Sequence, residues 1–521
     1  MTISARSPLD RVLPRDENAL PVPAKTPDLG ALPEWDLGDL YPAPDSPELA
    51  RDVEAVERAC CIFARDYDGK LVSLDAGKML ECIERYQEID ILAGRVMSYA
   101  GLRYYQNTTD STRAKQMGDL QDRITAATTK LVFFSLEFNR IPDARYEEIF
   151  AAPNGPARYK PVFDRMRAMR PYQLSNELER FLHDNSVVGA AAWNRLFDET
   201  TAGLTFAVEG EDEELGLEAT LNLLTDHDRA RREAGARALA EVFGRNVKLF
   251  ARIHNTLAKE KAIEDKWRKM PTPQTARHLS NHVEPEVVEA LKNAVTAAYP
   301  RLSHRYYRLK ARWLGLDKLQ VWDRNAPLPS ESPRLIPWAE AQATVLDAYA
   351  GFSPRLAELA QPFFAQGWID AAVKPGKAPG AFAHPTVPSA HPYVLLNYQG
   401  RTRDVMTLAH ELGHGVHQVL AAPNGALMAP TPLTLAETAS VFGEMLTFKA
   451  LLGQAETPQK RKILLAGKVE DMINTVVRQI AFYTFERKIH TARREGELTS
   501  ADLCELWMSV QAESLGPAIR L

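Results

Sequence analysis

Several features that mark particular classes of protein are scarce in this 521-residue sequence. It contains only four cysteines, and they lie far from any spacing typical of a metal site. Cys60 and Cys61 are adjacent, an arrangement unsuited to an ordinary structural disulfide. Because nothing in this pattern requires an oxidising compartment, we predict a cytoplasmic protein.

Long apolar runs are missing as well. No stretch reaches the roughly 18 consecutive apolar residues that suggest a membrane-spanning helix. The first 30 residues lack the apolar run of a secretory signal and contain several prolines. We therefore expect residues 1–30 to form a disordered leader.

Neither sign of charge dominates. The chain has 63 Lys and Arg residues against 68 Asp and Glu residues, which gives a formal net charge of -5. Such a balance creates no strong field that would attract a polyanion or an anionic membrane surface. We expect neither nucleic acid nor a membrane among its partners.

Strand-forming runs are few and short, and they lie at residues 204–208, 318–323 and 391–398. Elsewhere Ala, Leu, Glu and Arg predominate, with apolar residues recurring at helical spacing, as in 76–105 and 230–261. The sequence therefore predicts a mainly α fold with a small β-sheet.

The strongest motif is HELGH, which contains His410, Glu411 and His414. Its surroundings predict one helix that starts near Thr402 and stops before Pro423. On a helix, residues four apart lie on one face and about 6 Å apart along the axis, so both imidazoles can bind one ion. The alternative is a helical scaffold in which the two histidines merely fill a helix face.

Zinc suits this pair of histidines. Zn²⁺ accepts imidazole nitrogens at about 2.0–2.1 Å, and a site with three protein ligands leaves a position for water. Glu411 would lie beside that water and act as general base and then general acid in peptide hydrolysis. We expect one zinc ion per chain.

The third ligand distinguishes the classes of zinc peptidase. The metzincin pattern is excluded, because His417 stands where its glycine belongs and Leu420 where its third histidine belongs. A second helix is predicted from about Thr431, and Glu437 on it follows His414 by 23 residues. We expect Glu437 to be the third ligand, with Glu444 as the alternative.

Three further residues are candidates for a supporting role. Glu444 lies seven residues after Glu437 and can accept the free N–H of a ligating histidine, and Asp404 is a second candidate for that contact. A salt bridge or a helix cap is an equally plain role for either carboxylate. His417 is expected to support or pack against the site.

The segments NYQGRTRDVMTLAHELGHGVHQ and LAETAS, with EWDLGDLYP from Glu34 and PYQLSNELE from Pro171, resemble the thimet oligopeptidase and oligoendopeptidase F family. The resemblance implies a two-lobed helical clam around a deep channel. It also implies a zinc endopeptidase that cleaves short oligopeptides. We expect an amino-terminal helical domain at 31–200 and a catalytic domain at 201–521.

Substrate-binding residues are not assigned by the sequence. The run at 391–398 could present its edge to an extended peptide, with residues 380–382 as the alternative for that role. Equally, the run could simply complete the small sheet. Family members also continue into a segment rich in tyrosine and histidine that this sequence does not contain. The expectation is a carboxyl-terminal truncation, and the alternative function is an impaired zinc- and peptide-binding protein.

Overall fold

The structure is a computed structural model that describes residues 28–329 and 335–521. The leader expected at residues 1–30 lies almost entirely outside these residues. Helices make up most of the described chain, which confirms the predicted mainly α class. None of the described helices is both long and apolar enough to cross a membrane.

The helices up to residue 298 are α1 (Pro47–Tyr67), α2 (Ala76–Gln106), α3 (Ser111–Thr128), α4 (Val132–Arg140), α5 (Asp143–Ala151), α6 (Lys160–Arg167), α7 (Asn176–Asn185), α8 (Ala190–Ala202), α9 (Leu217–Leu223), α10 (Arg229–Arg268), α11 (Thr275–Ser280) and α12 (Pro285–Ala298). They are followed by α13 (Ser303–Trp313), the 3₁₀ helix η6 (Val321–Asp323), α14 (Trp338–Phe352), α15 (Pro354–Ala365), α16 (Thr402–Ala421), α17 (Leu433–Gln454), α18 (Pro458–Glu495) and α19 (Ser500–Leu515).

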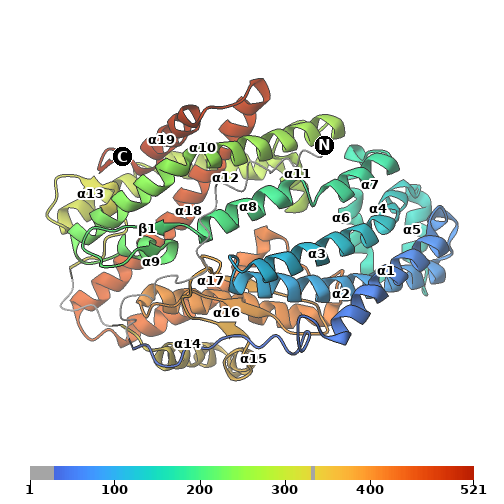
Figure 1. The fold of residues 1–521 in the computed structure, drawn as a ribbon, viewed down its shortest axis with the longest axis horizontal. Helices are drawn as coiled ribbons and strands as arrows, with labels where there is room; N and C mark the ends of the chain where they lie inside the picture. Colours follow the sequence, from blue (N-terminus) through green and yellow to red (C-terminus); the bar gives the residue numbers. More distant parts are fainter. Residues whose placement is uncertain (1–27, 330–334) are drawn as a thin grey trace, which may run out of the picture.

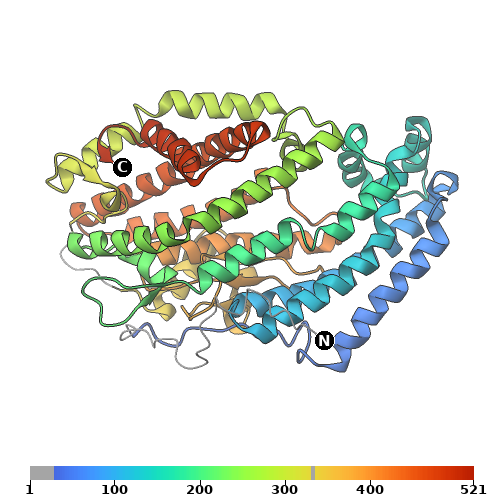
Figure 2. The ribbon, with the colours of Figure 1, turned by 45° about the horizontal axis from the view of Figure 1, so that its top comes forward.

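These helices form a two-lobed clam (Figures 1 and 2). The first lobe combines α1–α7 with α14–α17, and its hydrophobic core joins residues 29–163 to residues 338–416. The second lobe contains α8–α13, α18 and α19, with a core of its own between α12, α13, α18 and α19. The chain therefore passes from one lobe to the other more than once. The domain boundary expected at residue 200 stays a prediction. The larger hydrophobic core contains residues from both sides of this boundary.

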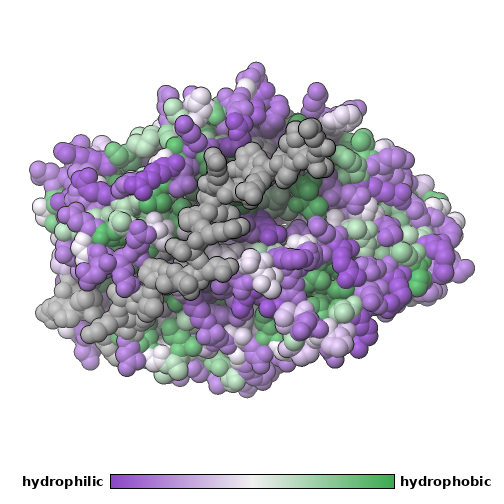
Figure 3. Space-filling model, in the orientation of Figure 1, coloured by the Kyte–Doolittle hydropathy of each residue, from purple (hydrophilic) through white to green (hydrophobic). Residues whose placement is uncertain are grey.

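The described surface mixes residue types. On the face drawn in Figure 3, hydrophobic residues are scattered among hydrophilic ones. Single exposed apolar residues of this kind are ordinary on folded proteins.

Short strands form three small sheets. β1 (Thr205–Phe206) pairs antiparallel with β2 (Leu215–Gly216), and β3 (Leu319–Gln320) pairs in parallel with β7 (Ile519–Arg520). The third sheet has the order β4-β6-β5, from β4 (Ile369–Asp370), β6 (Tyr393–Leu395) and β5 (Phe382–His384).

The position of β6 corrects one expectation. This strand comes from the run at 391–398, and it lies in the middle of its sheet with β4 and β5 on its two edges. Both edges of β6 are already paired with neighbouring strands. The expectation that the run at 391–398 presents a free edge to a peptide is therefore wrong. The alternative, residues 380–382, contributes to β5, which is an edge strand beside α16.

Helix α16 begins with a cap made by its own third residue. The Asp404 carboxylate accepts hydrogen bonds from the backbone N–H groups of Gln399, at 3.0 Å, and Arg401, at 2.9 Å. The N-cap is thus Arg401, and Thr402 is the first residue of the helix, as the sequence predicted. Behind this start, the apolar face of α16 is buried against α14, α15 and the three-stranded sheet.

Helices α16 and α17 approach each other unusually closely at two glycines. A Cβ atom on Gly413 of α16 would lie 2.7 Å from the carbonyl oxygen of Ala439 in α17. One on Gly443 of α17 would lie 2.2 Å from the hydroxyl oxygen of Tyr349. That hydroxyl donates a 2.6 Å hydrogen bond to the carbonyl oxygen of Ala409 in α16. The packing of these two helices therefore requires glycine at both positions.

Replacing Gly443 by alanine should lower the free energy of unfolding. The added methyl group would displace Tyr349 and its bond to α16, and overpacking of this kind typically costs about 1–3 kcal/mol. Gly453 is the matched control in the same helix, since a Cβ atom added there would have open space around it. Gly453→Ala should be neutral or stabilising by up to about 1 kcal/mol. Chemical denaturation of both variants measures the difference, and equal stabilities would contradict the packing argument.

Candidate metal centre

Side chains from α16 and α17 converge at one point. The Glu437 Oε2 atom lies 3.2 Å from His410 Nε2 and 3.5 Å from His414 Nε2. One donor atom from each of the three residues lies within 4.8 Å of the other two. The structure therefore brings together the three residues that the sequence predicted as ligands.

This geometry fits a tetrahedral metal ion. Two donors bound at about 2.0–2.1 Å to such an ion lie about 3.3–3.4 Å apart, which matches the separations between Glu437 and the two histidines. Two imidazole nitrogens and one carboxylate oxygen are also a donor set found in open zinc sites. The group can hold a metal ion.

Local contacts hold Glu437 in place. The fully buried Ser440, one turn further along α17, donates a hydrogen bond from its hydroxyl to Glu437 Oε2 at 2.8 Å. The close packing of Gly413 against Ala439 sets the distance between the two helices beside this contact. The sequence could have indicated this contact, because Ser440 follows Glu437 by three residues and residues three apart on a helix share a face.

Glu411 lies on α16 between the two histidines and is buried, with 7% of its surface exposed. Burial raises the pKa of its carboxyl to about 7, while His410 and a hydrogen bond from the backbone of Ala383 act in the opposite direction. Ala383 belongs to β5, so the edge strand contacts the carboxylate. This backbone contact has no signature in the sequence.

A chain of polar contacts supports His410 from behind. Its Nδ1 atom lies 3.2 Å from Glu444 Oε2, and the other oxygen of Glu444 forms an ion pair with Lys468 of α18. Burial opposes the charged imidazole, yet the bond to Glu444 and the nearby carboxylates raise the pKa of His410 overall. Burial also opposes ionisation of Glu444, but His410 and Lys468 lower the pKa of Glu444 below its usual value.

The other two candidates lie elsewhere around the site. Asp404 caps the start of α16. A helix cap was one of the roles expected for this carboxylate, besides a contact with a ligating histidine. His417 is half-buried on α16 and lies near enough to His414 to help lower the pKa of that histidine, after burial and His410. Lys468 was not predicted at all, because nothing local in the sequence places α18 against Glu444.

Comparisons with known proteins identify the family. A family model described as "Peptidase family M3" matches residues 222–520, more than half of the chain. The chain belongs to peptidase family M3. A second model, "Oligopeptidase F", matches residues 137–206 of this M3 peptidase, so the predicted resemblance is confirmed.

Curated relatives agree with this assignment. Oligopeptidase PepF of Bacillus subtilis is 25% identical over 481 residues, which cover 90% of this M3 peptidase and 70% of that protein. Group B oligopeptidase PepB of Streptococcus agalactiae is 26% identical over 495 residues, covering 93% and 80% of the two chains. Both names describe oligopeptidases, which is consistent with a peptidase of family M3.

Solved structures show the same fold. Oligoendopeptidase-F from Enterococcus faecium superposes with a TM-score of 0.67 at 22% identity, covering 91% of this M3 peptidase and 81% of that chain. "PZ peptidase A with inhibitor 2" gives a TM-score of 0.72 at 14% identity, covering 90% and 79%. At these identities the likeness concerns the fold.

Removing the cation behind Glu444 should weaken metal binding. In Lys468→Met the carboxylate loses its ion pair and orients His410 less firmly, and changes in such outer contacts typically cost about 10–100-fold in metal affinity. Lys449→Met is the control, because Lys449 is exposed on α17. Competition with a chromophoric chelator measures both affinities. A Lys468→Met variant that binds metal as tightly as the control would refute the supporting role.

Proposed function

We propose that this M3 peptidase is a zinc-dependent endopeptidase that hydrolyses short oligopeptides. His410, His414 and Glu437 are the zinc ligands, and Glu411 is the general base. The observation that carries the proposal is the convergence of two imidazoles and one carboxylate at tetrahedral spacing, with a buried carboxylate between the two histidines.

Zinc bound to these three residues supplies a Lewis acid that polarises a peptide carbonyl and acidifies a water molecule. The protein groups do the rest. Glu411 accepts the proton of the attacking water through its carboxylate and then delivers it to the leaving amine. The hydrogen bond from the Ala383 backbone keeps that carboxylate in position. Glu444 accepts from His410 Nδ1, which leaves Nε2 free to bind the ion.

The substrate class rests on the relatives and on the sheet. The names of the relatives describe oligopeptidases and oligoendopeptidases. Strand β5 is an edge strand beside α16, and an extended peptide can add to such an edge through backbone hydrogen bonds. The Ala383 carbonyl accepts a 3.1 Å hydrogen bond from Gln418 Nε2 and the Ala383 N–H donates to Glu411, so both backbone groups of this edge residue are already used within the protein.

The test combines metal content with turnover. Purified protein should contain about one zinc ion per chain and cleave a quenched fluorescent oligopeptide. Glu411→Gln should retain the zinc and lose about 10²–10⁴-fold in kcat, the range for general acid–base groups. Glu456→Gln is the control, since the Glu456 side chain is 82% exposed and lies outside the site.

Two results would contradict the proposal. Protein that binds no zinc at stoichiometric level would remove its basis. Protein that binds zinc and peptide without any turnover would instead select the alternative of a zinc- and peptide-binding protein.

A further inference from the structure

A small cavity lies in the second lobe, away from the metal centre. It is bounded by α13, η6, α18 and α19 and has a volume of about 10 Å³, which is room for roughly one water-sized group. Its polar lining residues are Tyr307, Arg324, Asn474, Arg478, Gln511 and Ser514. No carboxylate is among the residues that line it in the described part of the chain.

Two of the lining residues, Arg324 and Arg478, are arginines. Within residues 28–329 and 335–521, neither guanidinium forms a hydrogen bond or ion pair with a protein group. Arg324 Nε is buried without a partner there, and so is the hydroxyl of Tyr307, a residue that is 0% exposed. Arg478 lies over the ring of Phe482, 5.2 Å from its centroid, a contact that does not neutralise its charge.

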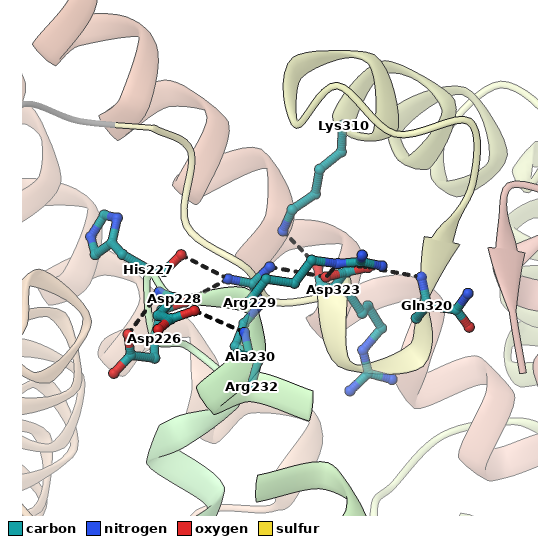
Figure 4. A network of polar contacts seen from close by, with 10 residues as sticks. Asp226, His227, Asp228, Arg229, Ala230, Arg232, Lys310, Gln320 and Asp323 are labelled. Carbon is teal, nitrogen blue, oxygen red and sulfur yellow. Dashed lines mark hydrogen bonds and ion pairs between the residues drawn. The ribbon is translucent and has the colours of Figure 1, made fainter. Parts of the chain in front are cut away.

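The neighbouring carboxylates are already occupied. Figure 4 shows Arg229 and Arg232 reaching Asp323, the residue before Arg324. Their Nη2 atoms lie 3.0 and 2.9 Å from its two carboxylate oxygens. Asp323 therefore has both oxygens committed to other guanidinium groups.

Glu470 is occupied in the same way. Its carboxylate pairs with the buried Lys310 and accepts a 2.7 Å hydrogen bond from the hydroxyl of Tyr306. The Lys310 ammonium also donates to the backbone carbonyl of Arg324, at 2.6 Å. The side chain of Arg324 gains nothing from this contact, which brings another positive charge close to it.

The guanidinium group of Arg324 acts on that of Arg478. Burial, followed by the charge of Arg324, lowers the pKa of Arg478 to about 10. Two like charges in a partly buried site destabilise the fold unless an opposite charge lies between them. Polar side chains line part of the cavity, and its volume of about 10 Å³ is that of one water-sized group. A chloride ion is somewhat larger, so it enters with a small outward movement of the partly exposed Arg324 and Arg478 side chains.

We propose that this cavity binds one small inorganic anion of about the size of chloride, held by the guanidinium groups of Arg324 and Arg478 with the Tyr307 hydroxyl as a further donor. The anion offsets one of the two positive charges and joins α13 and α18 to the segment that carries η6. The site is independent of the metal centre and of the proposed peptidase activity.

Thermal unfolding in matched salts tests the proposal with chloride as the probe. Replacing sodium gluconate by sodium chloride at constant ionic strength should raise the Tm saturably, by about 2 °C or more. Arg478→Gln should abolish the rise. Arg312→Gln is the matched control, because Arg312 is exposed on the neighbouring α13 and lies outside the cavity.

Two features make this experiment decisive. Without chloride, Arg478→Gln should be at least as stable as the wild type, since it removes one of two repelling charges. An equal Tm in gluconate and chloride, or a chloride response that persists in Arg478→Gln, would overturn the proposal.

Crystals of the wild-type protein soaked in bromide provide a test that does not depend on any variant. An anomalous-scattering peak between the guanidinium groups of Arg324 and Arg478 is the expected result. Bromide peaks confined to the outer surface, with none in the cavity, would overturn the proposal.

Discussion

The candidate metal centre depends on the close packing of α16 against α17. Its donors come from two helices, and a metal–ligand bond of about 2.0–2.1 Å tolerates little change in their separation. Gly413 lets the backbone of α16 approach Ala439, and Gly443 leaves room for Tyr349, whose hydroxyl binds the carbonyl of Ala409. Each glycine destabilises its helix by about 1 kcal/mol relative to alanine, but it allows this close approach.

Both lobes contribute to the support of this centre. The first lobe provides α14, α15 and the sheet behind α16, and Phe363 of α15 would lie 2.7 Å from a Cβ atom on Gly415. The second lobe provides Lys468 of α18, which pairs with Glu444 and so reaches His410. A relative movement of the lobes that separated α18 from α17 would break this ion pair. The orientation of His410, one of the three proposed ligands, is therefore coupled to the contact between the lobes.

Local periodicity was sufficient to predict the three residues that converge at the candidate metal centre. His410 and His414 lie one turn apart on a helix whose apolar stripe is plain in the sequence, and Glu437 lies on the next predicted helix. The mainly α class and the small sheet could be predicted for the same reason, since both follow from spacing along short segments.

Contacts between distant segments could not be predicted in this way. Lys468 reaches Glu444 only because α18 returns from the other lobe, and the central place of β6 depends on strands that are separate in sequence. Asp404 accepts hydrogen bonds from backbone N–H groups at the start of its own helix. In the described part of the chain, Asp323 pairs with Arg229 and Arg232, and Glu470 pairs with Lys310. These ion pairs join segments that are distant in the sequence, and they leave neither carboxylate for Arg324 or Arg478.

Zinc K-edge X-ray absorption of the wild type and of Gly413→Ala tests the central role of the α16–α17 contact most directly. The wild type should show two imidazoles and the Glu437 carboxylate in the first coordination shell of zinc. In folded Gly413→Ala, where the new Cβ pushes the helices apart, the carboxylate should leave the shell or zinc affinity should fall sharply. An unchanged shell with unchanged affinity would contradict the account.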